Sequence, residues 1–428
     1  MTARTRPLIV FVTRRVPVRA QSGGTIRAHR LLMGLAERFE VVLVAFDGGD
    51  GEPPAHPAEL ARELPGIETV AIPAPSEGKR RQQLLSVPAR RSWSFGRYAT
   101  PALGAAIHGV ARERDARLVH FDGPGVFLLG PVPHRINAVA PYDIEHEIQR
   151  AAVERTTGVR RAFARLETRK VLVEERVQWR TADICVAVSE LDEQAMRRGG
   201  ARQVIVVPNG TDAVPRLPIP QRSPAEPLRI LFVGAPYLPN RLGVEWLIAR
   251  VLPAVQARIP VTLDVVGLLH DQVPPATGVK VHGRVPSVAP FYASAHVAVV
   301  PIFEGSGSRL KVVEAMARGV PTLSTPLGAT GLGLTPGIHY RAADDEGSFA
   351  TALIELGDEL ASNPDRLEPM LASARSAAEA LFWPRIADRL ASGYQAALDR
   401  DPRRSAGDAV PHVRPTRAGP KGVSSCEY

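Results

Sequence analysis

Residues 299–325 read VVPIFEGSGSRLKVVEAMARGVPTLST, a stretch in which apolar runs flank a glycine-rich segment and a helical pattern. An apolar run ending at Pro301 has the composition of a buried strand, and the small residues Gly305 to Ser308 separate it from a helical pattern over Arg309–Arg318. A second apolar run, Pro321–Ser324, follows that helix. Strand, glycine-rich turn, helix and strand in this order predict an α/β protein with a mostly parallel sheet.

The predicted helix in this stretch offers a site for an anion. Small residues before it let the backbone approach a ligand closely, and unpaired N–H groups at a helix start attract negative charge. Lys311, Glu314 and Arg318 recur at i, i+3 and i+7, so they share one helix face. A cation suits phosphate, and a carboxylate suits paired hydroxyls because it offers only acceptors. The pattern indicates a sugar-nucleotide site, and a capped amphipathic helix with an exposed ion-pair face is the alternative.

The alternation of strand and helix continues along the whole chain. A proline-rich segment, residues 213–227, divides the pattern into two α/β halves, because so many prolines exclude a helix or a central strand. We expect a long charged helical stretch at 144–180 and a turn at Gly23-Gly24 followed by a helix over Thr25–Arg38. Expected strands are Leu8–Thr13, Glu40–Phe46, Leu118–Phe121, Ile136–Ala140, Asp183–Val188, Val204–Val207, Leu228–Val233, Val261–Val266, Val297–Pro301 and Pro321–Ser324.

The composition is typical of a soluble globular protein and excludes a collagenous or disordered chain. The 428 residues are 45% apolar and 23% charged, enough for two or three domains. Two cysteines make no disulfide framework, and no apolar run is long enough for a spanning helix, so we expect a cytoplasmic protein. The formal charge of +9 comes from residues 1–222, with 33 basic and 24 acidic side chains, whereas residues 223–399 have 14 and 17.

The basic excess does not indicate nucleic-acid binding. No zinc finger, RNP-like stretch or heptad accompanies it, and aromatic residues are only 5% of the chain. Segment 79–97 holds six basic residues and no acid, and segment 147–180 holds nine basic residues against five acids. For segment 79–97 we weigh peripheral contact with an anionic membrane at the inner membrane surface, or contact with the acceptor, against an ordinary surface loop.

Cofactor and metal motifs are missing from the sequence. The run from Gly123 to Gly130 has Leu128 where a dinucleotide fingerprint needs its third glycine, and no Gly-Lys-Ser/Thr phosphate loop occurs. No Asp-x-Asp pair is present to bridge a metal ion to a diphosphate. We therefore expect neither a resident cofactor nor a metal site.

Several stretches resemble the family 4 retaining glycosyltransferases, which belong to the glycosyl transferases group 1 and have the GT-B fold. Beside residues 299–325 they are Pro208-Asn209-Gly210 with Asp212, Phe232-Val233-Gly234 with Pro239-Asn240, Gly243-Val244-Glu245-Trp246, Asp264–Gly267 and His282-Gly283-Arg284-Val285. Gly23-Gly24 and Val188-Ser189-Glu190 extend the resemblance into the first half, and Phe382-Trp383 with Tyr394 resemble the family's final helix. The resemblance covers residues 7–399.

The resemblance implies two Rossmann-like domains facing across a cleft. The expected division is an N-terminal acceptor-binding domain (1–212), the linker (213–227), a C-terminal nucleotide-sugar donor domain (228–381), a helix that crosses back and packs on the N-terminal domain (382–399), and a disordered basic tail (400–428). Transfer of a sugar from a nucleotide-diphosphate donor to an acceptor hydroxyl follows as the expected activity, with retention implied by the resemblance alone. The acceptor would be a glycan, a lipid-linked molecule or a small molecule.

Residue roles carry over position by position. Glu314 matches the glutamate that binds the ribose hydroxyls, and the backbone near Arg284 and Val285 would contact the base. The implied donor-binding residues are Gly24, Arg241, Arg284, Val285, Gly305, Ser306, Gly307, Ser308, Arg309, Lys311 and Glu314. One departure is clear: the family has two glutamates separated by seven residues, whereas nine separate Glu304 from Glu314. Glu304 therefore does not inherit the first glutamate's role, and Gly305 or Ser306 would occupy that space.

The catalytic candidates are His146 and Asp143 in the first half and Lys311 and Glu314 in the second. The resemblance places a functional His or Asp just after the strand Ile136–Ala140, whereas Asp143 as a helix N-cap with an exposed His146 is the alternative. A nucleotide-sugar epimerase of similar two-domain fold and a non-catalytic sugar-nucleotide-binding protein remain as alternative functions.

Overall fold

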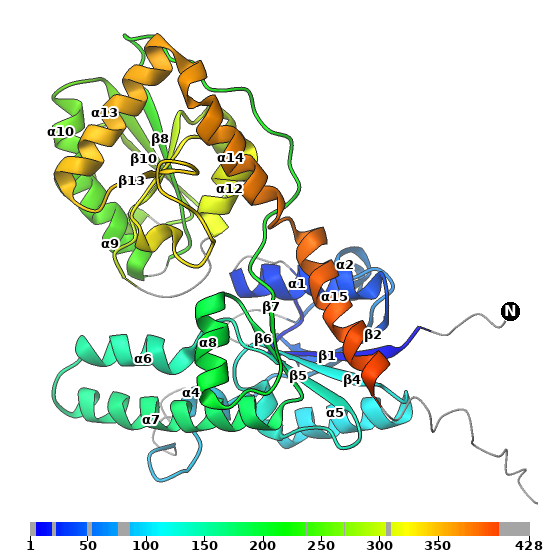
Figure 1. The fold of residues 1–428 in the computed structure, drawn as a ribbon. Coiled ribbons are helices and arrows are strands. Elements are labelled where there is room, and N and C mark those ends of the chain that lie inside the picture. The colour runs from blue at the N-terminus through cyan, green and yellow to red at the C-terminus, as the bar shows by residue number, and fades with distance from the viewer. Residues whose placement is uncertain are drawn as a thin grey trace, which may run out of the picture.

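The computed structural model describes residues 6–18, 23–48, 54–75, 86–236, 238–268, 270–304 and 310–401. Two parallel β-sheets form two domains, one above the other in Figure 1, and helices cover both faces of each sheet. This is the predicted α/β architecture of two Rossmann-like domains. The residues from 402 onward, expected to be a disordered tail, lie outside the described residues.

The first domain contains a seven-stranded parallel sheet in the order β3-β2-β1-β4-β5-β6-β7. Its strands are β1 (Leu8–Thr13), β2 (Glu40–Asp47), β3 (Glu68–Pro73), β4 (Leu118–Asp122), β5 (Ile136–Ala140), β6 (Ile184–Ala187) and β7 (Val204–Val206). Successive residues of β1 face opposite sides, as a strand requires. Ile9 and Phe11 enter one buried cluster, and Val10 and Val12 enter another. The sheet therefore has a core on each face.

The helices of the first domain are α1 (Gly23–Ala36), α2 (Pro57–Glu63), α4 (Trp93–Gly96), α5 (Pro101–Glu113), α6 (Glu145–Glu154), α7 (Gly158–Thr181) and α8 (Glu190–Gly199). Two expectations are corrected. The stretch 144–180 is two helices, because the chain reverses at residues 155–157 and Gly158 has a φ of +57°. Gly23 and Gly24 lie in the first turn of α1 rather than in a turn before it.

The second domain contains a six-stranded parallel sheet in the order β10-β9-β8-β11-β12-β13. Its strands are β8 (Leu228–Val233), β9 (Val261–Val266), β10 (Val279–Gly283), β11 (Val297–Val300), β12 (Thr322–Ser324) and β13 (Arg341–Ala342). Its helices are α9 (Leu238–Trp246), which continues through one π-helical turn into α10 (Leu252–Gln256), α11 (Ala289–Ser294), α12 (Leu310–Arg318), α13 (Glu346–Ser362) and α14 (Glu368–Glu379).

The chain crosses between the domains twice, and the two crossings are paired. The second crossing leads into α15 (Trp383–Arg400), which packs on α1, as expected from the sequence. Ile386, Leu390 and Tyr394 of this helix lie in the same buried cluster as the leucines of α1. Next to it, Thr211 donates to the Leu381 carbonyl (2.9 Å), and Trp383 donates to the Thr211 carbonyl (3.0 Å). The two crossing segments are therefore hydrogen-bonded side by side (Figure 1).

Candidate functional site

The carboxyl ends of the two sheets are brought together between the domains. Arg155, in the turn between α6 and α7, forms an ion pair with Glu304, which follows β11. Leu310, the first residue of α12, packs against the core of the first domain. Loops and helix starts gather at strand carboxyl ends, and ligands of open α/β sheets bind there. The structure therefore places the candidate site where these loops meet.

α12 turns a polar, half-buried face toward α9, β8 and α11 of the second domain. Lys311 donates to the side-chain oxygen of Asn240, and its ammonium lies 4.8 Å from the centre of the Phe232 ring. Tyr292 donates from its hydroxyl to Glu314 at 3.3 Å. Lys311 and Glu314 are thus oriented by the protein rather than extended into solvent. The exposed ion-pair face considered above does not describe this helix.

Burial raises the pKa of the Glu314 carboxyl. This effect of removal from water exceeds the opposing effects of Arg318 and of the Tyr292 hydrogen bond. Arg318 donates to the Glu314 carbonyl at 3.1 Å and stacks over the Tyr292 ring at 4.7 Å. A carboxylate held in this way is poised to accept hydrogen bonds from hydroxyl groups.

Of the remaining donor-side candidates, Arg241, Arg284 and Val285 lie within the described residues. Gly305, Ser306, Gly307, Ser308 and Arg309 lie outside the described residues. Arg241 is on α9, where it pairs with Glu245 at 3.7 Å, and its Nε is buried without a hydrogen-bond partner. Arg284 is exposed after β10, and Val285 is partly buried against an apolar cluster of the second domain.

In the first domain, His146 is held by a residue that the sequence did not single out. Its Nδ1 lies 2.6 Å from Oε2 of Glu175, a buried residue of α7. The same carboxylate accepts from the backbone N–H groups of Glu145 (2.8 Å) and His146 (3.2 Å), which begin α6. With Nδ1 as the donor to Glu175, Nε2 is the atom available to a ligand. Asp143 is half-buried next to this start, and the carboxylate that caps α6 comes from Glu175.

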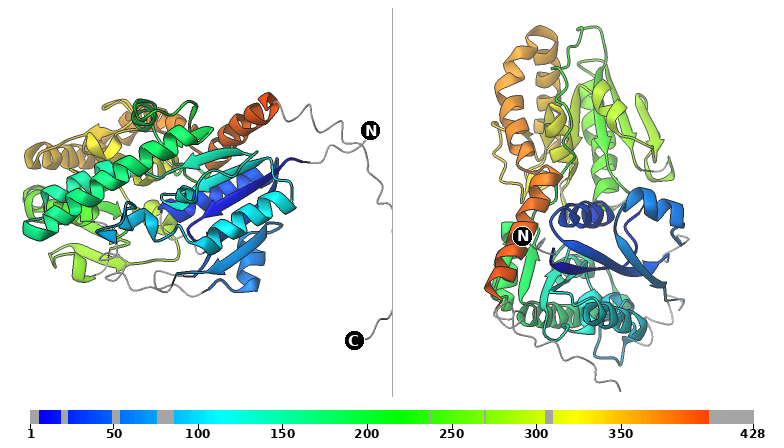
Figure 2. Two further views of the ribbon diagram at one scale, coloured as in Figure 1. Left: turned by 90° about the horizontal axis from the view of Figure 1, so that it is seen from below. Right: turned by 90° about the vertical axis from the view of Figure 1, so that its right-hand side faces the viewer.

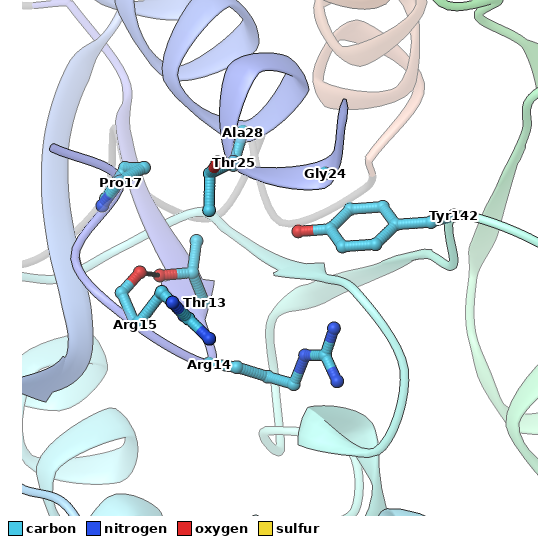
Figure 3. Close-up of a pocket in the computed structure, with 8 residues that line it drawn as sticks. All are labelled: Thr13, Arg14, Arg15, Pro17, Gly24, Thr25, Ala28 and Tyr142. Atoms are coloured by element: carbon cyan, nitrogen blue, oxygen red, sulfur yellow. Dashed lines mark hydrogen bonds between the residues drawn. The ribbon is translucent and has the colours of Figure 1, made fainter. Parts of the chain in front are cut away.

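A cavity of about 160 Å³ opens at the carboxyl end of β1. Its lining residues are Thr13, Arg14, Arg15, Pro17, Gly24, Thr25, Ala28 and Tyr142, shown in Figure 3. The guanidinium of Arg14 extends toward Tyr142 in this view and lies 5.0 Å from the ring centre of Tyr98 and 5.9 Å from that of Tyr142. Two aromatic rings thus position a cation next to the cavity.

Gly24 has a packing reason to be glycine. A Cβ at this position would lie 2.7 Å from Cε2 of Tyr142, which is closer than a real Cβ contact. The aromatic ring therefore covers the start of α1 and forms a wall of the cavity (Figure 3). The predicted close approach of a ligand at Gly24 remains a prediction, and the approach seen in the structure is that of Tyr142.

Tyr142 is fixed by a chain of buried polar groups. Its hydroxyl donates to Asp122 at 2.6 Å, and the other oxygen of Asp122 lies 3.3 Å from His120. His120 is in turn hydrogen-bonded to Tyr394 of α15. Burial, reinforced by Asp122, raises the pKa of Tyr142 well above its usual value, so this hydroxyl remains a hydrogen-bond donor.

The described residues contain neither a cluster of metal ligands nor a membrane-spanning helix. Among the described residues, no group of three or more histidine, cysteine and carboxylate side chains is arranged to hold a metal ion. No helix in the described ranges has the length and apolar character needed to cross a bilayer.

The arrangement of two facing Rossmann-like domains with a final helix that returns to the first domain is the GT-B fold. Residues 227–359 match the sequence profile of the family described as Glycosyl transferases group 1, so the chain contains a domain of this glycosyltransferase family. None of the curated proteins is significantly similar to the chain in sequence.

Solved structures extend the likeness over both domains. Sucrose-phosphate synthase from Thermosynechococcus elongatus is 18% identical, with a TM-score of 0.66 over 92% of this chain and all of that one. HepE of Anabaena, solved in complex with UDP and glucose, is 16% identical, with a TM-score of 0.60 over 91% of this chain and all of that one. A glycosyltransferase from Rickettsia africae is 11% identical, with a TM-score of 0.62 over 93% and 100%. At these identities the likeness establishes the fold.

Sequence reasoning singled out the α12 face and His146 as candidates but missed the residues that orient them. Glu175 lies 29 positions from His146 within a charged helix, and nothing in its spacing distinguishes it from a solvated glutamate. Tyr292 lies in a short segment without a motif, and Tyr142 directly precedes the candidate Asp143 but was not itself singled out. For Arg14 a signal existed, because it directly follows the predicted strand Leu8–Thr13 and therefore lies at a carboxyl edge.

Proposed function

We propose that this protein transfers a sugar from a nucleotide-diphosphate donor to the hydroxyl of an acceptor, with retention of anomeric configuration and without a metal ion. The donor lies on the second domain and the acceptor on the first. The observation that carries the proposal is the half-buried face of α12, on which Lys311 and Glu314 are each oriented by a second side chain within the family domain.

The roles of the α12 residues follow from their charge. Glu314 accepts hydrogen bonds from the ribose hydroxyls, because its burial and its contact with Tyr292 leave a fixed acceptor on the surface of the site. Lys311 neutralises charge on the diphosphate as the bond to the sugar breaks. Gly305–Ser308, Arg309, Arg241, Arg284 and Val285 complete the proposed donor site.

The first domain supplies the second set of groups. Arg14 offers a cation beside the cavity at the carboxyl end of β1, where Gly24 also lies. His146 offers Nε2 to the donor sugar or the acceptor, because Glu175 occupies Nδ1. Asp143 is proposed next to it. Closure of the domains excludes water and limits hydrolysis of the donor.

The first test is nucleotide binding measured by calorimetry and by thermal shift with UDP, GDP and ADP. Because HepE was solved with UDP-glucose, uridine diphosphate is the first nucleotide to try. We expect one diphosphate to raise the melting temperature, since a ligand that binds only the folded state stabilises it. Absence of a shift with all three would contradict the donor site.

Two substitutions separate the proposed roles on α12. Lys311→Met should weaken binding of the nucleoside diphosphate more than that of the nucleoside, whereas Glu314→Gln should weaken both. Lys280→Met is the matched control, because Lys280 is an exposed lysine on β10 of the same domain. Equal affinities for Lys311→Met and Lys280→Met would remove Lys311 from the site.

Product analysis distinguishes the alternatives. A transferase consumes an acceptor, an epimerase changes the donor sugar without one, and a binding protein gives no product. Proton NMR of the glycoside formed reports whether the anomeric configuration is retained. Activity that survives exhaustive chelation supports the metal-free reaction, and activity restored only by a divalent cation contradicts it.

A further inference from the structure

α7 divides its charges by side. Its three glutamates, Glu167, Glu174 and Glu175, are all buried against the protein. Four of its five exposed arginines lie on the other side, together with three valines and a leucine, and the fifth, Arg160, lies in the first turn. We call these eight residues the outer face of α7: Val159, Arg165, Leu166, Arg169, Val173, Arg176, Val177 and Arg180.

The helix period places these eight residues together. At about 100° per residue, all of them fall within an arc of roughly 120°. The arginines occupy one flank of this arc, and the aliphatic residues occupy the other. Four of the ten exposed large hydrophobic side chains in the described part of the chain lie on this one helix, and Val159 is 86% exposed. An arginine stripe therefore runs beside an aliphatic stripe.

The glutamates of α7 are not available to these arginines. Glu174 accepts from the backbone of Ser92 (2.9 Å), Glu167 accepts from the backbone of Trp93 (2.6 Å), and Glu175 caps α6. Within the described ranges, none of the four arginines forms an ion pair; Arg180 donates to a backbone carbonyl, that of Gly199. The usual pairing of arginine and glutamate along a solvated helix is therefore missing here.

The location of the outer face suits contact with an extended surface. α7 runs along the side of the first domain turned away from the second domain, as both figures show (Figures 1 and 2). Exposed Val87, Arg90 and Arg91 lie in a neighbouring segment that Lys170 of α7 holds by donating to the Ser86 carbonyl at 2.6 Å. The same combination of valine and arginine thus continues beyond the helix.

We propose that the outer face of α7 docks the protein on an anionic lipid surface. Arginines next to a membrane bind lipid phosphates, and aliphatic side chains on the same helix insert at the level of the headgroups. Nucleic acid would satisfy the arginines but would leave the aliphatic stripe in water. The proposal does not depend on the donor or on the reaction, because no residue of the outer face belongs to the candidate site.

The test is co-sedimentation of the full chain with vesicles of phosphatidylcholine, with or without roughly one third phosphatidylglycerol. We expect binding to the anionic vesicles and little to the neutral ones. The triple variant Arg165→Gln, Arg169→Gln, Arg176→Gln should bind about 100-fold more weakly, at roughly fivefold for each arginine. No preference of the unaltered protein for anionic vesicles would overturn the proposal.

A matched control removes the same charge from other parts of the protein. Arg250, Arg258 and Arg389 are exposed on the second domain and on α15, and their change to glutamine lowers the net charge equally. This control should bind the anionic vesicles like the unaltered protein. If both triple variants lose affinity to the same extent, net charge and not the outer face is responsible, and the proposal fails.

The aliphatic stripe has its own test at constant charge. Val159→Ser with Val173→Ser should reduce vesicle binding several-fold and leave thermal stability unchanged, because both side chains are exposed. Unchanged vesicle binding would reject insertion. Duplex DNA is the competing ligand: retention of DNA that depends on the same arginines, without vesicle binding, would assign the face to nucleic acid instead.

Discussion

Glu175 and Glu174 are neighbours on α7, both are buried, and each accepts hydrogen bonds at the start of a different helix, so the two can be compared directly. Glu175 accepts two backbone N–H groups at the start of α6 and also holds His146. Glu174 accepts from the backbone and hydroxyl of Ser92 at the start of α4. Replacement of either by alanine should destabilise the protein, but only Glu175→Ala should impair transfer.

The size of both effects follows from these bonds. Hydrogen bonds to a charged acceptor contribute about 1.5–3 kcal/mol each, and two that share one carboxylate do not add fully, so we expect a loss of about 3 kcal/mol for either variant. For domains of this size that corresponds to a fall in Tm of roughly 6–12 °C. The loss of orientation of His146 should lower kcat by about 100-fold in Glu175→Ala.

The assay pairs urea unfolding with steady-state kinetics at a temperature where both variants are folded. Glu174→Ala supplies the control, because it carries the same truncation one residue away without touching His146. If Glu175→Ala and Glu174→Ala lose stability equally and both keep the kcat of the unaltered protein, Glu175 is only a helix cap. The proposed role of His146 would then be refuted.

Three other predictions concern stability. Because burial raises the pKa of Glu314 in the folded protein, the stability that this carboxyl contributes is complete below its unfolded pKa and is lost as the pH rises through its folded pKa. Glu314→Gln should therefore raise the Tm at pH about 7.5, and this gain should disappear below pH about 4.5. Leu390→Ala, in the core between α15 and α1, should cost about 2–5 kcal/mol in urea unfolding, and a cost under 1 would indicate that α15 is not docked. Arg155→Ala should cost less than about 1 kcal/mol, because its ion pair with Glu304 is partly exposed, and a larger loss would show that the pair is essential to the domain arrangement.

The fold was predictable from the sequence because its signals are local. Each predicted apolar run contains a strand, and Leu8–Thr13 and Val261–Val266 have the predicted bounds, since a strand buried on both faces needs continuous apolar residues. Strands β3, β10 and β13 were missed. β3 and β10 alternate exposed and half-buried residues, and β13 has only two residues, so none of them forms an apolar run.

The candidate site was predictable only where one segment carries the pattern. Lys311 and Glu314 lie on one helix, and their spacing alone places them on one face. The partners that orient the site come from distant segments: Asn240 is 71 positions from Lys311, and Tyr394 is 274 positions from His120. Such pairs depend on the packing of whole elements, which helical or strand periodicity does not encode.

The pairing of the two crossings between the domains has a mechanical consequence. A single connecting segment would allow the domains to rotate about several axes. Two adjacent segments that are hydrogen-bonded at Thr211 restrict relative rotation mainly to one axis. The turn between α6 and α7 lies at the end of the first domain away from α15 (Figures 1 and 2). A rotation about the paired segments would therefore move Arg155 and Glu304 farther than groups next to α15, and their ion pair would be among the first contacts between the domains to break.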